Sequence, residues 1–140
     1  MATYPVPVAG LVIRYAYLWK RESDRGKTEG QKRRPCVVVV CVENVDGEQI
    51  VTVAPITHTK PSELDPAIEL TPATRRRLGL GAEKNWIMAT EVNSFFWLGP
   101  DLAPTASGEY AYGELPAVVF KALTAKILAA GKSVGEVLRS

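Results

Sequence analysis

Pro35-Cys-Val-Val-Val-Val-Cys-Val42 is a near-continuous apolar run dominated by β-branched residues. A run of this length and composition predicts a strand that is buried on both faces. It is followed by Asp46-Gly47, a dipeptide typical of hairpin turns. Gln49–Thr57 then predicts the returning strand, although its Pro55 fits a sheet only at an edge or a bulge. We therefore expect a hairpin with Pro35–Val42 as the central strand.

Segments of similar β-branched and aromatic composition flank this hairpin. They predict a first strand over Gly10–Trp19, a short edge strand over Ala67–Leu70 and a further strand over Trp86–Val92. Phe95–Pro100 leads out of the last of these into a loop rich in proline, glycine and serine. Lys20–Arg33 has almost no apolar residue, so we expect a long, mobile polar loop that is available for function.

A short helix is predicted after Thr71. This residue is suited to the N-cap position, and Pro72 to the first helical position. The helix should run over Ala73–Leu78 and stop at Gly79.

A second helix is predicted near the C-terminus, between Pro116 and Gly131. Its apolar residues recur on one face at helical spacing: Val119, Phe120, Leu123 and Ile127. Ser133 and Glu136 have the spacing of a capping box and predict a short terminal helix.

The order of these elements predicts a mainly β fold with α (α+β). We expect one small, strongly curved antiparallel sheet or barrel with helices packed against it. The 140 residues suit a single domain over residues 1–140, and 46% apolar with 23% charged residues is ordinary globular usage. No apolar run approaches the roughly 20 residues that cross a membrane, and no signal peptide is recognisable. We therefore expect a cytoplasmic protein without a membrane partner.

Several kinds of site are excluded by the residues present. His58 is the one histidine of the sequence, and no cysteines, histidines and carboxylates have metal-site spacing. Cys36 and Cys41 would point to opposite faces of one strand, so we expect free thiols. Glycine-rich nucleotide motifs and the Gly-x-Ser-x-Gly motif do not occur. The sequence therefore predicts neither a metal nor a cofactor.

Positive charge is concentrated around the loop before the central strand. Arg14 to Arg34 contains 8 lysines and arginines against 3 acids, whereas the whole chain has a formal net charge of +2. This asymmetry indicates that one end of the molecule meets an anion, with nucleic acid as the first candidate. A solvated basic loop is the alternative, and charge alone leaves both interpretations open.

Polar residues lie at the open end of the predicted hairpin. Lys32, Arg33 and Arg34 precede the central strand, and Thr57 and His58 end its partner. The position of the turn makes Arg34 and Thr57 neighbours. A guanidinium beside a hydroxyl can grip a phosphate, because arginine binds two oxygens in a planar fork and threonine donates one hydrogen bond. The other interpretation is a basic strand cap with a threonine that satisfies a backbone group.

Four segments occur in a specific order: Gly10-x-Val-Ile13, Lys32-x-Arg34-Pro35, Val53-Ala-Pro-Ile-Thr57 and Glu91-Val-Asn-Ser94. This order resembles the PemK/MazF family of bacterial type II toxins, which belongs with the CcdB/PemK-like small β-barrels. Trp97-x-Gly-Pro-Asp-Leu102 is similar to a PemK-like branch of that family. The resemblance implies an SH3-like β-barrel homodimer that cleaves single-stranded RNA without a metal and is silenced by an antitoxin. It also implies that Arg34 and Thr57 contribute to catalysis.

The chemistry of metal-free RNA cleavage fits these residue types. It needs a deprotonated 2′-hydroxyl, a stabilised pentacoordinate phosphate and a protonated 5′-oxygen. Arg34 is suited to stabilising the phosphate, and Thr57 to orienting it. Histidine often supplies a missing acid or base, so His58 is a catalytic candidate if the strand ends before it. A loop or core histidine is the alternative.

The sequence departs from the family where better-known members have Gln-x-Arg and this chain has Glu91-Val-Asn93. A neutral amide thus replaces an arginine, which weakens the expected grip on RNA. Glu91 then acts as a base or braces Arg34 in an ion pair. The predicted RNA contacts are Lys32, Arg33, Asn93, Ser94 and Trp97. Trp97 would stack on a base, although adjacent aromatics also fill cores or dimer contacts.

Two functions stay open at this point. The first is a toxin-type endoribonuclease (an mRNA interferase), with the loop Arg21–Arg33 closing over RNA. The second is a non-catalytic binding protein on the same barrel. That protein would be a CcdB-like poison of a large protein target, or a degenerate toxin that only binds its antitoxin or RNA.

Overall fold

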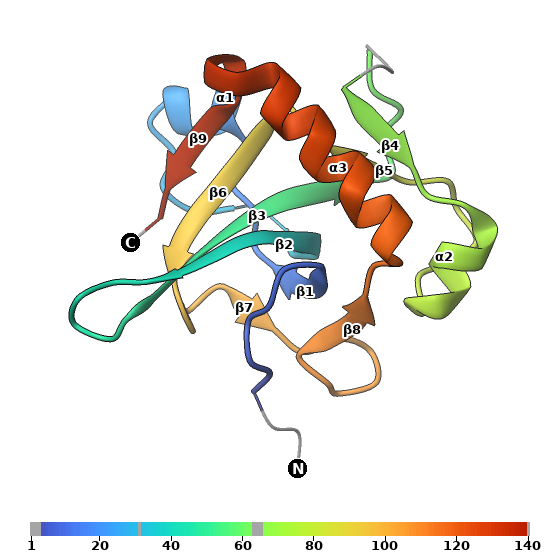
Figure 1. Cartoon of the computed structure of the whole chain (residues 1–140), viewed down its shortest axis with the longest axis horizontal. Coiled ribbons are helices and arrows are strands. Elements are labelled where there is room, and N and C mark those ends of the chain that lie inside the picture. The colour runs from blue at the N-terminus through green and yellow to red at the C-terminus, as the bar shows by residue number, and fades with distance from the viewer. Residues whose placement is uncertain (1–3, 31, 63–65, 140) are drawn as a thin grey trace.

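The computed structural model of the chain describes residues 4–30, 32–62 and 66–139. Its described residues form a 9-stranded, mainly antiparallel sheet with a few helices (Figure 1). The prediction of a mainly β fold with a short helix after Thr71 and a C-terminal helix is confirmed. In chain order the elements are β1 (Leu11–Tyr15), α1 (Lys20–Asp24), β2 (Arg34–Glu43), β3 (Gln49–Thr57), β4 (Ala67–Glu69), α2 (Pro72–Arg77), β5 (Trp86–Met88), β6 (Glu91–Phe96), β7 (Leu102–Ala103), β8 (Ala111–Glu114), α3 (Ala117–Ala130), the 3-10 turn η1 (Gly131–Ser133) and β9 (Gly135–Leu138).

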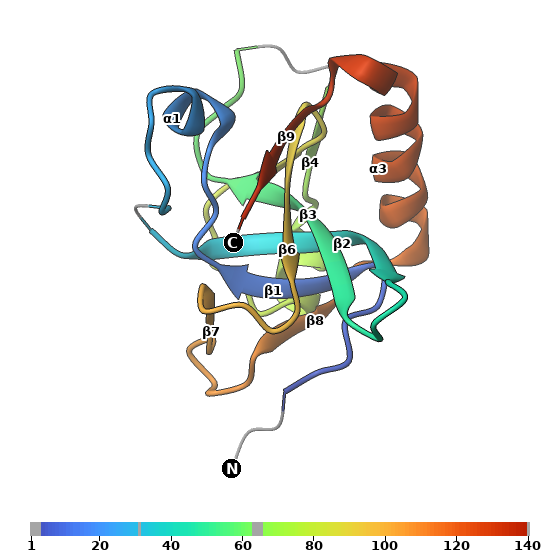
Figure 2. The ribbon, with the colours of Figure 1, turned by 90° about the vertical axis from the view of Figure 1, so that its left-hand side faces the viewer.

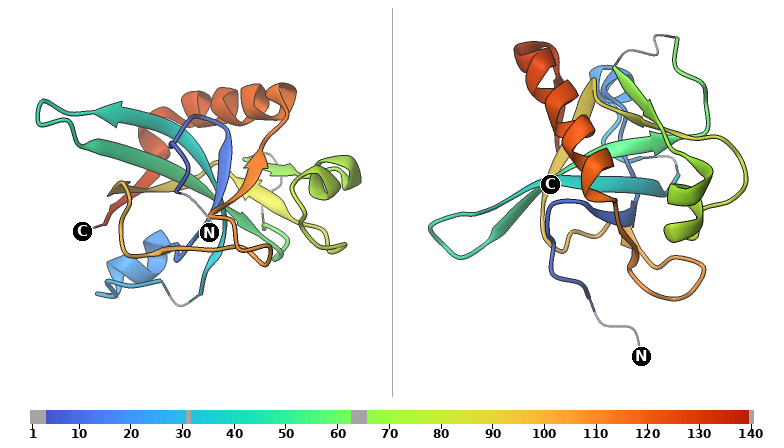
Figure 3. Two further views of the ribbon diagram at one scale, coloured as in Figure 1. Left: turned by 90° about the horizontal axis from the view of Figure 1, so that it is seen from below. Right: turned by 45° about the vertical axis from the view of Figure 1, so that its right-hand side comes forward.

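The predicted hairpin of β2 and β3 lies at the centre of the sheet, with Cys36 opposite Pro55. Successive residues of β2 face two separate cores, because Val37 packs in one apolar cluster and Val38 in the other. Burial on both faces is therefore confirmed for this part of the strand. Beyond a bulge between Val38 and Val40, the hairpin projects from the body of the molecule (Figure 3).

Pro55 lies where β3 changes its partner on one side. Ile50–Val53 pairs with β6, whereas Ile56 and Thr57 pair with β5. The ladder on that side is interrupted between these two stretches. Such an interruption is the kind of place where a strand tolerates a residue without an N–H.

Helix α3 runs along one face of the sheet (Figure 2). Its predicted apolar face is confirmed, because Val119, Phe120, Leu123 and Ile127 all pack in or against the cluster that contains Val37 and Ala54. The helix ends before Gly131, which has a φ of 55°. In α2, the Thr71 hydroxyl accepts a hydrogen bond from the Thr74 N–H at 3.2 Å, as predicted for an N-cap.

The predicted terminal helix is wrong. Gly135–Leu138 forms β9, which pairs in parallel with β6, and Val137 is buried. The Ser133 hydroxyl donates back to the Ala130 carbonyl at 2.7 Å and does not cap a new helix. Pairing with β6 and burial of Val137 therefore outweigh the local capping pattern.

Several other boundaries differ from the prediction. The first strand ends at Tyr15 and not at Trp19, and β7 and β8 lie where a loop was expected. The single strand expected over Trp86–Val92 is divided into β5 and β6, because β5 pairs with β4 and the end of β3 while β6 pairs with the rest of β3. β6 also continues through Phe95, which was expected to begin a loop, because Phe95 packs in the second core. The expected loop Lys20–Arg33 contains the five-residue α1.

The described part of the chain has no helix that is long and apolar enough to span a membrane. Among the same residues, no group of histidine, cysteine and carboxylate side chains is placed to hold a metal. Cys36 and Cys41 are both free thiols, the first buried and the second half-buried.

Candidate functional site

A groove of about 690 Å³ lies at the open end of the β2–β3 hairpin, beside α1. Four of its lining side chains are cationic and one is acidic, so it is a basic groove. Arg34 and Thr57, expected from the sequence to be neighbours, both line this groove. The lining residues are Tyr17, Trp19, Arg21, Glu22, Lys32, Arg34, Thr57, Thr59, Lys60, Pro61, Ser62 and Met88.

Arg34 is the first residue of β2, where it lies opposite Tyr15 of β1. Its guanidinium carbon lies 4.9 Å from the centroid of the Trp19 ring. Its Nε is buried and has no hydrogen-bond partner among the described residues. Burial lowers the pKa of Arg34 from its ordinary value. The guanidinium therefore lies on an aromatic face and keeps an unused hydrogen-bond donor, its Nε–H. A bound anion would stabilise this state.

Thr57 is the last residue of β3 and is 7% exposed. Its Oγ1 accepts a hydrogen bond from the Thr59 N–H at 3.1 Å, which fixes the position of the oxygen. Since that oxygen acts as an acceptor here, its own proton can be donated into the groove. Cys36 pairs with Pro55, and continuing this antiparallel register by two residues places Arg34 beside Thr57.

The wall of the groove opposite Thr57 comes from the segment Ala16–Trp19 between β1 and α1. The Tyr17 hydroxyl donates to Glu91 Oε1 at 3.1 Å, and the Lys20 N–H donates to the same oxygen at 2.8 Å. Burial, reinforced by the negative charge of Glu91, raises the pKa of Tyr17 far above its ordinary value. Glu91 is thus a brace for this wall, and the described residues include no ion pair between Glu91 and Arg34.

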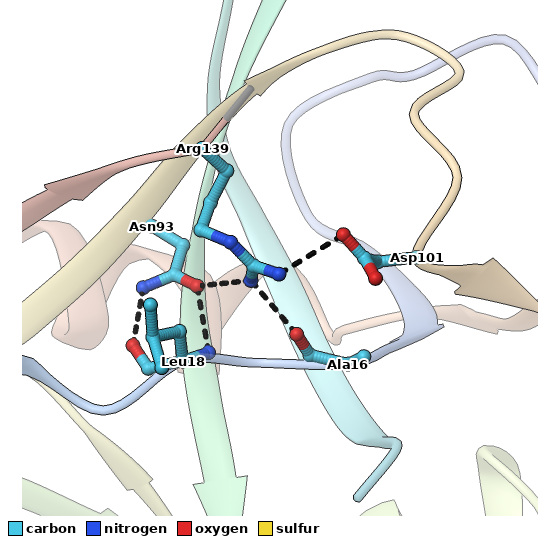
Figure 4. A network of polar contacts seen from close by, with 5 residues as sticks. All are labelled: Ala16, Leu18, Asn93, Asp101 and Arg139. Carbon is cyan, nitrogen blue, oxygen red and sulfur yellow. Dashed lines mark hydrogen bonds and ion pairs between the residues drawn. The ribbon is translucent and has the colours of Figure 1, made fainter. Parts of the chain in front are cut away.

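Asn93 is fully buried and does not reach the groove. Its Oδ1 accepts from the Leu18 N–H at 2.9 Å, and its Nδ2 donates to the Leu18 carbonyl at 2.8 Å (Figure 4). The carboxamide thus pairs with the backbone of Leu18 as a neighbouring strand would. Direct contact of Asn93 with RNA, as expected from the sequence, is inconsistent with this position.

Ser94 and Trp97 also lie away from the groove. Ser94 is 4% exposed, and its hydroxyl lies between Thr52 Oγ1 at 2.9 Å and Glu136 Oε2 at 2.8 Å. Trp97 is half-buried against the second core, with its ring 6.2 Å from that of Phe95. These contacts give both side chains internal roles and place neither beside Arg34.

His58 lies on the other side of the strand end from Thr57. It lines a separate cavity of about 230 Å³ with Pro35 and Ile56. Its Nδ1 lies 3.6 Å from the Glu83 carboxylate. The alternation of side chains at the end of β3 therefore separates His58 from the basic groove.

Lys32 lines the basic groove, whereas its neighbour Arg33 is exposed and does not. Of the five RNA contacts expected from the sequence, Lys32 alone is among the lining residues.

The comparison with protein families matches residues 16–95, more than half of the 140 residues, to a family described as PemK-like, MazF-like toxin of type II toxin-antitoxin system. The chain belongs to this family. The matched range contains every residue that lines the basic groove. No curated protein matches the chain.

Sequence reasoning missed several groove residues of this PemK/MazF-like toxin. Trp19 falls in the expected first strand, and Arg21 and Glu22 fall in the loop expected to close over RNA; the sequence singles out none of them as a site residue, yet all three line the groove. Arg21 lies over the Trp19 ring at 5.1 Å, like Arg34 at 4.9 Å. The alternation of Tyr17 and Trp19 was the available pattern, because residues two apart in extended chain face the same way.

Proposed function

We propose that this PemK/MazF-like chain is a toxin-type endoribonuclease that cleaves single-stranded RNA without a metal ion and is neutralised by a cognate antitoxin. The observation that carries the proposal is the shared position of Arg34 and Thr57 in a basic groove. Membership of the family supports the role of a toxin with an antitoxin partner. The groove contains side chains that can bind a phosphodiester.

In the proposed reaction, the 2′-oxygen of the ribose attacks the adjacent phosphorus and the bond from phosphorus to the 5′-oxygen breaks. Negative charge builds on the non-bridging oxygens in the transition state, and Arg34 stabilises it from within its half-buried position. The Thr57 hydroxyl donates to one of these oxygens and holds the phosphate against Arg34. Both groups are fixed before RNA arrives, Arg34 by Trp19 and Thr57 by the Thr59 N–H.

The proton of the 2′-hydroxyl needs an acceptor. Glu22 is the one carboxylate among the residues that line the groove in the described part of the chain. It extends from α1, and its Oε2 forms a long ion pair with the Lys27 ammonium at 4.0 Å. We assign Glu22 as the general base, in place of His58 and Glu91, and water as the source of the proton on the 5′-oxygen.

Single-stranded RNA suits the remaining lining residues. Arg21, Lys32 and Lys60 can neutralise phosphates on either side of the scissile one, while Trp19 provides aromatic surface. Proteins that bind single strands combine these two features, a basic track and aromatic faces for the bases. The positive charge also makes binding salt-dependent.

The proposal includes an SH3-like closure of the sheet, a cytoplasmic location and a homodimer. Cross-strand partners share a face of a sheet, and two such rows carry exposed apolar residues: Val40, Val42, Phe96 and Leu138. We call these four residues the hairpin face. Exposed apolar surface of this kind marks an interface, and we propose a second copy of the chain as its occupant, as expected for this family.

The alternative of a non-catalytic binding protein was suggested by Glu91 and Asn93. Both residues instead hold the wall of the groove through Tyr17, Leu18 and Lys20. Their identity therefore carries no argument for the loss of a nuclease.

The test is cleavage of a long, weakly structured RNA by the purified protein in EDTA. Arg34→Ala should lose all cleavage while remaining folded by circular dichroism. The matched control is Arg76→Ala, which removes an exposed arginine of α2 and should cleave like the parent. Equal cleavage by the parent and Arg34→Ala would overturn the proposal. Absence of fragments with the parent would favour the binding-protein alternative.

A further inference from the structure

The segment Ala16–Trp19 forms one wall of the basic groove but lies beyond the end of β1. Side chains from strands that are far away in sequence supply three hydrogen bonds to its backbone. Asn93 of β6 binds both the N–H and the carbonyl of Leu18. Glu91, also of β6, binds the Lys20 N–H. The position of this wall therefore depends on polar side chains and not on a continuous strand ladder.

Arg139 completes this set from the end of β9. It is 7% exposed, and its guanidinium reaches three acceptors (Figure 4). Nη1 donates to the Ala16 carbonyl at 2.8 Å and to Asn93 Oδ1 at 3.1 Å, and Nη2 donates to Asp101 Oδ2 at 2.9 Å. The Ala16 carbonyl belongs to the wall, and Asn93 is the residue whose carboxamide binds the Leu18 backbone.

Asp101 joins the same segment from the other direction, because its carbonyl accepts the Ala16 N–H at 3.0 Å. The Ala16 carbonyl is thus bound by Arg139, and the Ala16 N–H is bound by Asp101, which is also the ion-pair partner of Arg139. The guanidinium also lies over the Tyr15 ring, 5.4 Å from its centroid. Among the described residues, every side-chain contact of Arg139 goes to the residues that lead into the wall or to the groups that hold them, whereas its backbone N–H donates to the Ser94 carbonyl.

We infer that Arg139 is a positioning residue for the basic groove: it fixes the segment Ala16–Trp19, and through the Trp19 ring it fixes the guanidinium of Arg34. The effect of Arg139 on RNA cleavage rests on the proposed function. The placement of Trp19 by Arg139 is independent of that function and can be measured without RNA. A planar guanidinium is required because one group must meet a backbone carbonyl, an amide oxygen and a carboxylate together.

The experiment compares four proteins: the parent, Arg139→Gln, Trp19→Ala and the double variant. The first readout is acrylamide quenching of tryptophan fluorescence in the absence of RNA. The chain contains 3 tryptophans, so the contribution of Trp19 is the difference between each protein and its Trp19→Ala counterpart. We expect Trp19 to become more accessible in Arg139→Gln. Arg76→Gln, which removes an equal charge from the exposed face of α2, should leave the quenching unchanged.

The second readout is RNA cleavage, with binding of a mixed-sequence 2′-O-methyl RNA, which lacks the attacking hydroxyl, measured alongside. Arg139→Gln should lower kcat/KM by up to about tenfold, the loss expected for Trp19→Ala itself, because misplacement of a catalytic group by about 1 Å can cost this much or more. In the Trp19→Ala background, the same substitution should change the rate by no more than about twofold, because Arg139 acts on Arg34 through the Trp19 ring and that ring is then absent. Loss of fold alone would give the same fold-change in both backgrounds.

Unchanged Trp19 quenching in folded Arg139→Gln would overturn the inference, as would equal effects in the two backgrounds. If Arg139→Gln does not fold, Arg139→Lys replaces it. A lysine keeps a cation beside Asp101 but cannot meet all three acceptors, so quenching should still rise, and unchanged quenching would again overturn the inference. If the parent neither cleaves nor binds RNA, the proposed function fails, and the quenching still decides whether Arg139 places Trp19.

Discussion

The guanidinium of Arg34 lies over the indole ring of Trp19, with 4.9 Å between the guanidinium carbon and the ring centroid. Arg34 has no ion pair among the described residues, and its Nε has no partner. An aromatic face holds a cation without neutralising it, so the charge stays available for a phosphate. A carboxylate in the same place would compete with RNA for the guanidinium.

Trp19→Ala should therefore impair the proposed cleavage while the protein stays folded. Loss of a cation–π contact of about 0.5 to 2 kcal/mol frees the guanidinium to leave its position. We expect kcat/KM to fall by about tenfold. Trp19→Phe, which keeps an aromatic face, should retain most of the activity. Equal rates for the parent and Trp19→Ala in a cleavage assay would show that Arg34 does not depend on the ring.

Thr57→Val should abolish most of the cleavage, because valine has the shape of threonine but no hydroxyl to donate to the phosphate. A loss of about a hundredfold in kcat is expected for one missing hydrogen bond in the transition state. Thr57→Ser keeps the hydroxyl and is the matched control. The valine variant also leaves the Thr59 N–H without its acceptor, so unfolding in urea should be checked. A valine variant as active as the serine variant would remove Thr57 from the mechanism.

Glu22→Gln tests the assignment of the general base. The parent should lose activity in acid as the carboxylate takes up a proton, whereas the glutamine variant should be slow at every pH and lack this limb. General-base catalysis typically contributes about a hundredfold or more to the rate. The pH profile of kcat/KM is the measurement. A glutamine variant with the parent's profile would place the base elsewhere.

The sequence predicted the centre of the fold because the pattern there is local. The sequence there shows an apolar run that is buried on both faces, a hairpin turn and a returning strand. The position of the turn and the lengths of the strands decide which residues meet at the open end, and they place Arg34 beside Thr57. Arg139 and Asn93 could not be found in this way. Their partners are Ala16 and Leu18, which lie 123 and 75 residues away along the chain.

The expectation that Asn93 and Ser94 contact RNA does not fit their positions in the structure. Both are buried with internal partners. The same limit applies to α1, because a five-residue polar helix has no apolar periodicity to detect. Its start is fixed by Glu91, which accepts the Lys20 N–H across the sheet. Long-range hydrogen bonds, which leave no periodic trace in the sequence, thus decide the wall of the groove.

Stability should fall in alkali. Burial raises the pKa of Tyr17 above its ordinary value of 10.0, so the folded protein keeps a proton that the unfolded chain releases above that pH. The stability is thus fully present below about pH 10 and declines as the pH rises further, by about 1.4 kcal/mol per pH unit for one such group. Tyr17→Phe should be less stable at neutral pH, since it loses the hydrogen bond to Glu91, but its decline above pH 10 should be shallower. Urea unfolding at several pH values measures both.

The slope of Tyr17→Phe is compared with that of the parent under the same conditions. An identical slope in the two proteins would mean that the Tyr17 hydroxyl ionises as readily in the folded protein as in the unfolded chain.

The hairpin face should decide the oligomeric state. Val42 is 54% exposed and lies opposite Ile50, which lies opposite Phe96 on the next strand. Val42→Glu places a charge at the end of this row, and burying an unpaired charge in an interface is costly. We expect light scattering to give a dimer for the parent and a monomer for Val42→Glu. Val118→Glu, at a more exposed position of α3, should stay dimeric. Dissociation by Val118→Glu with a dimeric Val42→Glu would move the contact to α3, and a monomeric parent would remove the homodimer from the proposal.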